Sequence, residues 1–116
     1  MNVSLKWRVF LAACTVMVAL TAAANAQDVV GRWRDNTDGG IVEYRSDGTF
    51  LMSHPRMRMS GRWTMASPGV LKFTVNGQSA ICSVEVNGRV KRMSDCPMVD
   101  ANTGRIIYET TATRID

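Results

Sequence analysis

The side chains best suited to binding a metal ion lie between residues 52 and 65. They recur at every second position over much of this segment: Met52, His54, Met57, Met59, Trp63 and Met65. Because side chains two apart share one face of an extended strand, the pattern predicts a thioether-rich face. Thioether and imidazole groups suit Cu(I), and the candidate ligands are Met52, His54, Met57 and Met59. The alternative interpretation is that these methionines only fill the core, since Met adapts to irregular gaps.

Arginines alternate with these methionines and therefore occupy the opposite face of the same segment. The candidates for this basic face are Arg56, Arg58 and Arg62, together with Arg32, Arg34 and Arg45 from earlier in the chain. A guanidinium group pairs well with carboxylate or phosphate. The face therefore predicts an anionic partner, such as an envelope glycan, lipopolysaccharide or an acidic protein. The alternative is an ordinary solvated sheet face whose charges discourage edge pairing.

The residues expected of a catalytic centre are missing or have a structural explanation. His54 is the sole histidine and the sequence has no G-x-S-x-G motif, which argues against the common nucleophile–histidine arrangements. Asp35, Asp38 and Asp47 lie in or beside turns, where aspartate bonds to the backbone. We therefore expect a non-enzyme, with no catalytic residues and no cofactor beyond the candidate Cu(I).

The first 26 residues have the organisation of a secretory signal peptide. Lys6 and Arg8 form a positive start, and residues 9–20 are uncharged and mainly apolar. Ala24 and Ala26 hold the small-residue positions of a cleavage site, so we expect a helical signal peptide cut after Ala26. The apolar run is shorter than the roughly 20 residues of a spanning helix, so we expect no transmembrane span in the mature form. The protein is predicted to be periplasmic or secreted.

The three cysteines divide between this segment and the domain that follows it, residues 27–116. The stretch ending at Cys14 resembles a lipoprotein cleavage site, but the apolar run before it is too short, so lipidation is the less favoured alternative. Cys82 and Cys96 form an even pair, which predicts a disulfide in an oxidising compartment. Such a bond closes a loop of about 15 residues and stabilises the domain by about 3 kcal/mol.

Turn signals recur at short spacing throughout residues 27–116, and the runs between them are rich in β-branched and aromatic residues. The expected strands lie near residues 28–34, 40–45, 48–54, 56–65, 70–75, 78–86, 89–94 and 105–114. No segment has a helical period of useful length. The pattern predicts an all-β fold, a small antiparallel up-and-down β-barrel or flattened sandwich of about eight strands.

Alternation also predicts which side chains point inward. The expected inward sets are Phe50, Met52 and His54; Met57, Met59, Gly61, Trp63 and Met65; Leu71, Phe73 and Val75; and Ala80, Cys82, Val84 and Val86. For the turn at Asn87-Gly88 we expect a three-residue loop that pairs Val86 with Val90. This register points Arg92 inward.

Several short motifs resemble those of small bacterial lipocalin-like domains, which are exported antiparallel barrels. They are Gly31-Arg32-Trp33, Asp47-Gly48-Thr49-Phe50, Gly61-Arg62-Trp63 and Val70-Leu71-Lys72-Phe73. The resemblance implies a binding module, although a domain this short is expected to hold no roomy ligand chamber. In its ligand types, the Met/His set is also similar to small periplasmic Cu(I)/Ag(I)-binding barrels, with a different order and spacing.

The overall composition fits this interpretation. The chain is 46% hydrophobic, which is enough to build a core. Its net charge is +4, and without Lys6 and Arg8 of the signal peptide the charge is 12 − 10 = +2, too mildly basic to argue for nucleic acid. The sequence therefore predicts an exported periplasmic binding or interaction module. The alternatives are a Cu(I)-binding protein and a small envelope enzyme inhibitor.

Overall fold

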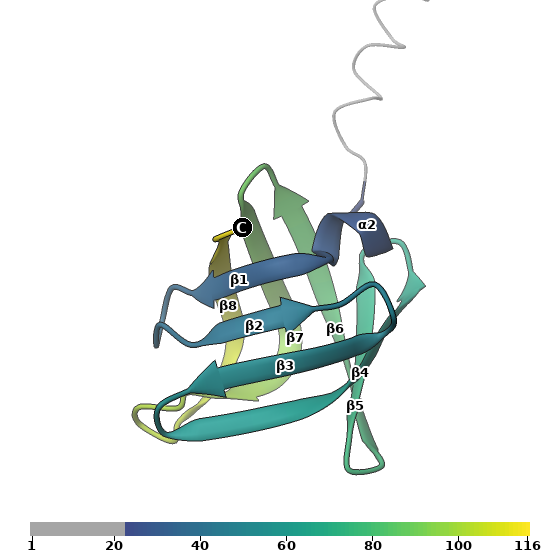
Figure 1. Cartoon of the computed structure of the whole chain (residues 1–116). Helices are drawn as coiled ribbons and strands as arrows, with labels where there is room; N and C mark the ends of the chain where they lie inside the picture. Colours follow the sequence, from purple (N-terminus) through teal and green to yellow (C-terminus); the bar gives the residue numbers. More distant parts are fainter. Residues whose placement is uncertain (1–22) are drawn as a thin grey trace, which may run out of the picture.

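The computed structural model describes residues 23–116 as an all-β barrel with one short helix (Figure 1). The elements are α2 (Ala26–Val29), β1 (Gly31–Asp35), β2 (Ile41–Tyr44), β3 (Thr49–His54), β4 (Met57–Ser67), β5 (Val70–Val75), β6 (Gln78–Asn87), β7 (Val90–Val99) and β8 (Ile106–Arg114). The predicted fold class is confirmed. The lipidation candidate Cys14 and most of the expected signal peptide lie outside the described residues. Within residues 23–116, no helix is long and apolar enough to cross a membrane.

The strands form a closed antiparallel barrel in which each pairs with its neighbours in sequence, and β1 pairs with β8 to complete the ring. Up-and-down topology sends alternate hairpins to opposite ends. The β1–β2, β3–β4, β5–β6 and β7–β8 loops therefore share one end, here called the mouth. The other connections share the opposite end, where α2 and the C-terminus lie (Figure 1). We call this the closed end.

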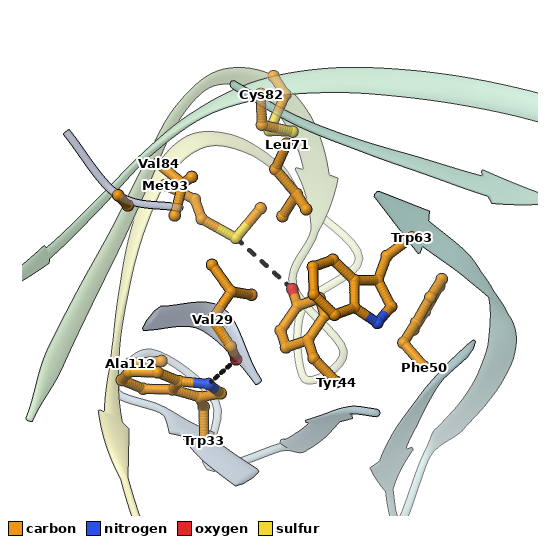
Figure 2. Packing of buried hydrophobic residues seen from close by; sticks show 12 residues of the cluster. Val29, Trp33, Tyr44, Phe50, Trp63, Leu71, Cys82, Val84, Met93 and Ala112 are labelled. Atoms are coloured by element: carbon orange, nitrogen blue, oxygen red, sulfur yellow. Dashed lines mark hydrogen bonds between the residues drawn. A yellow bond between two sulfur atoms is a disulfide. The ribbon is translucent and has the colours of Figure 1, made fainter. Parts of the chain in front are cut away.

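The helix α2 replaces the predicted beginning of the first strand, which starts at Gly31 and not at residue 28. In the uncleaved chain the amide of Asn25, a residue of the expected signal peptide, donates to the Asp28 carboxylate at 3.0 Å in the first turn. Val29 is fully buried and its carbonyl accepts a hydrogen bond from the Trp33 indole at 2.9 Å (Figure 2). The helix therefore adds an apolar side chain to the core at the closed end.

The predicted faces of β3, β4, β5 and β6 are confirmed. In β4 the side chains of Met57, Met59, Trp63 and Met65 are buried or half-buried, and the arginines between them are exposed. The most completely buried residues of the core are Val29, Trp33, Leu71, Cys82, Val84 and Cys96. Figure 2 labels the first five of them. The alternation of β4 therefore gives the barrel wall one apolar and one basic side.

The predicted register of β6 against β7 is wrong by one residue. Val86 pairs with Lys91, not with Val90, so Lys91 points inward and Arg92 points out. The turn is shorter than expected, and Val90 is left 43% exposed on the outer face. This register is favoured because it places Met93 opposite Val84 in the core. Lys91 lies two residues before Met93 on the same face of the strand, so it also points into the barrel.

An irregularity in β7 changes which residues point inward in the second half of the strand. Asp95 has a φ of 63°, and the pairing with β8 shifts between Ser94 and Met98. A bulge of this kind changes which residues face inward. Cys96 is thereby buried and forms the predicted disulfide with Cys82, which is confirmed.

Candidate functional site

The barrel encloses a cavity of about 480 Å³ that opens at the mouth. Its wall is largely apolar and includes Phe50, Met52, Met59, Phe73, Val75 and Met93. Its rim carries side chains from the four mouth hairpins, among them Asp38, His54, Asn76 and Ala101. The expectation of no roomy chamber is wrong, since cavities of about 300–1,000 Å³ accommodate small molecules. A short domain achieves this because eight strands of modest length suffice to close a barrel around an interior.

The structure brings the four candidate Cu(I) ligands together on the cavity wall near the mouth. Met52 lies opposite Met59 across β3 and β4, and His54 lies opposite Met57 one step nearer the hairpin. Nδ1 of His54 accepts the Arg56 amide hydrogen at 3.0 Å, so the neutral ring carries its own hydrogen on Nε2, and the ring must give up this hydrogen bond to ligate a metal. Trp63 and Met65 lie further along β4 and do not line this cavity. Among residues 23–116, no cluster of three or more His, Cys, Asp or Glu side chains forms a metal site.

The arginines predicted as one basic face occupy two separate strips. Arg56, Arg58 and Arg62 are exposed on or beside β4, and Arg32 and Arg34 are exposed on β1. Strands β2 and β3 lie between them. The remaining candidate, Arg45, forms an exposed ion pair with Glu43 at 3.3 Å.

Lys91 is a buried, ionisable residue of the interior that the sequence interpretation missed. It is the second residue of β7 and is only 2% exposed, and it lines the cavity beside Tyr44. Its Nζ donates to the Tyr44 hydroxyl at 3.2 Å and lies over the rings of Tyr44 and Trp33, at 4.3 and 5.4 Å from their centroids. Lys91 lies two residues before Met93 and therefore shares its face of the strand. This spacing is the sequence signal that could have placed Lys91 inside.

Burial dominates the electrostatics of this group. Desolvation lowers the pKa of Lys91 to about 7; the Asp35 carboxylate opposes this shift and the Arg114 guanidinium adds to it. Burial also raises the pKa of Tyr44 above its usual range, an effect that Asp35 reinforces, so the hydroxyl stays protonated. The barrel therefore holds an amine that is partly neutral at neutral pH beside a protonated phenol.

The charged groups around Lys91 are held by their own partners. The Asp35 carboxylate accepts hydrogen bonds from the Thr37 amide at 2.7 Å and the Thr110 hydroxyl at 3.1 Å. The Arg114 guanidinium lies over Trp33 at 4.2 Å and donates to backbone carbonyls of the α2 segment. Neither group forms a close ion pair with Lys91.

Comparisons of the chain with protein-family models, with curated proteins and with solved structures found no match.

Proposed function

We propose that the protein is an exported, lipocalin-like binding module that takes up a small, mainly apolar molecule. The observation that carries the proposal is the cavity of about 480 Å³, closed at the α2 end and open at the mouth. Burying an apolar ligand there gains about 25 cal/mol for each Å² removed from water. The rigid, hydrogen-bonded wall is formed before the ligand arrives, which lowers the entropic cost of binding.

Two features support export as part of this proposal. The chain begins with the basic, apolar and small-residue regions of a signal peptide. The domain also carries a buried disulfide between Cys82 and Cys96, a bond typical of oxidising compartments.

Filling part of the cavity should weaken the binding of an apolar probe. Ala80 points inward from β6 and lines the cavity, whereas the next residue, Ile81, is 59% exposed on the outer face. We expect Ala80→Phe to weaken binding of N-phenyl-1-naphthylamine about tenfold or more, because the ring occupies ligand volume. Ile81→Phe, the matched control, should bind the probe like the original protein. Fluorescence titration measures both, and equal binding by the two variants would contradict the proposal.

A second candidate function is Cu(I) binding, favoured by the way β3 and β4 pair. The register places Met52 beside Met59 and His54 beside Met57, so three thioethers and one imidazole meet on one wall. These soft ligands fit Cu(I). The ion would sit in the mouth, where it is reachable from solvent.

The test replaces two thioethers by side chains of similar shape. We expect Met57→Leu together with Met59→Leu to lower Cu(I) affinity at least about tenfold in competition with a colorimetric chelator. Met65→Leu lies on the same face of β4 but away from the cavity, and should leave the affinity unchanged. Should the double variant compete as well as the original protein, the methionines are wall-forming side chains and the copper candidate fails.

A further inference from the structure

The Lys91 amine is placed as a reactive group inside the proposed ligand cavity. Its side chain extends from β7 near the closed end, so a molecule entering at the mouth meets it with its leading atoms. We propose that Lys91 captures apolar aldehydes by forming an imine between its Nζ and the aldehyde carbon. The inference rests on the proposed function, because it needs a cavity that admits an apolar chain.

The surroundings of Nζ favour the neutral amine that this chemistry needs. The groups facing it are the Asp35 carboxylate from β1, the Tyr44 phenol from β2 and the Arg114 guanidinium from β8. Desolvation outweighs the attraction of Asp35, and the lowered pKa of about 7 leaves a large neutral fraction at neutral pH. A lysine desolvated in an apolar pocket is a recognised nucleophile toward carbonyl compounds.

The Tyr44 hydroxyl is positioned to donate a hydrogen bond to the oxygen of the incoming aldehyde. Its hydroxyl lies 3.2 Å from Nζ and donates to the Met93 thioether at 3.8 Å, a weak acceptor (Figure 2). Because burial keeps the phenol protonated, it can turn from Met93 and donate to a carbonyl oxygen beside the amine. Donation there polarises the carbonyl as the new C–N bond forms.

The reaction is a condensation and needs no redox partner. The nitrogen lone pair attacks the carbonyl carbon, and a proton shift to oxygen gives a carbinolamine. The carbinolamine then loses hydroxide with a proton as water, so both amine hydrogens and the aldehyde oxygen leave together and a C=N bond remains. The apolar wall protects the imine, since its hydrolysis requires water to reach the carbon.

The experiment uses decanal as the probe, with cyanoborohydride to reduce any imine to a stable secondary amine. The mass of the chain then increases by that of the aldehyde less its oxygen atom. Fragment mapping of the unmutated protein locates the adduct without relying on a variant. We expect labelling of Lys91 to exceed that of the exposed Lys72 by about tenfold or more, and 1-decanol, which cannot condense, to suppress it.

Two variants sharpen the result. Lys91→Met has an uncharged side chain of similar length and should lose the adduct while keeping the circular dichroism spectrum of the folded barrel; Lys72→Met should be labelled like the original protein. Labelling that favours Lys72 or another amine, with decanol still displacing the fluorescent probe, would overturn the Lys91 inference and leave the binding function intact. If decanol neither displaces the probe nor affects labelling, the binding function fails as well.

Discussion

Lys91→Met is expected to raise the free energy of unfolding at pH 7 by about 2–4 kcal/mol. The folded barrel holds the amine at a pKa of about 7, whereas the unfolded chain holds it near the ordinary value for lysine. The unfolded state therefore binds the extra proton between these two values, and the original protein becomes more stable as the pH rises through that window. Methionine fills the same space and carries no proton.

The pH dependence provides the sharper measurement. The difference in free energy of unfolding between Lys91→Met and the original protein should shrink by about 2 kcal/mol between pH 7 and pH 9, measured by urea unfolding. Lys72→Met, a substitution on the exposed face of β5, should show no such change. An advantage that is equal at both pH values would mean that Lys91 is not desolvated in the folded state.

Removing the disulfide is expected to lower the free energy of unfolding by about 3 kcal/mol. Cys82 and Cys96 are 14 residues apart, and the crosslink restricts the unfolded chain more than the folded one. It also joins β6 to the part of β7 that follows the bulge at Asp95, where regular pairing with β8 is interrupted. We therefore expect faster amide exchange in residues 95–105 as well as a lower unfolding midpoint.

The comparison needs two independent ways of breaking the bond. The double substitution Cys82→Ala with Cys96→Ala should resemble the original protein measured with reductant. Both should unfold at clearly lower denaturant than the oxidised protein. Identical midpoints with and without reductant would show that the crosslink contributes nothing to stability.

The sequence predicted the strands and most inward faces because local pattern decides them. In β4 the alternation of mainly apolar with polar side chains allows a single orientation against an apolar interior, and the structure has that orientation. The positions of Met52 and His54 follow for the same reason. Their cross-strand partners, Met59 and Met57, come from a tight hairpin that fixes the register.

Lys91 was predicted on the wrong face because the choice between two registers of β7 depends on residues distant in the sequence. Locally, Val90 is the better inward residue and lysine the better outward one. The packing of Met93 against Val84 and the bulge at Asp95 reverse that preference. Burying an amine lowers the stability of the fold, so local alternation predicts that a lysine faces solvent. In this protein the packing of the whole barrel places the lysine inside. The cavity escaped prediction for a related reason: its volume depends on barrel closure, which alternation alone does not determine.

The hydrogen bonds of the last residues determine which end of the barrel faces solution when the protein is attached to a surface. The Asp116 carboxylate accepts the Arg32 amide hydrogen at 3.0 Å, and Arg114 bonds to the Val30 and Asp28 carbonyls at 2.9 and 2.8 Å. Residues from both ends of the described chain are thus fastened at the closed end. A protein immobilised through Asp116 would stand with its mouth directed away from the support and open to solution. Attachment through the β1–β2 loop, residues 36–40, would turn the same opening toward the support and obstruct it.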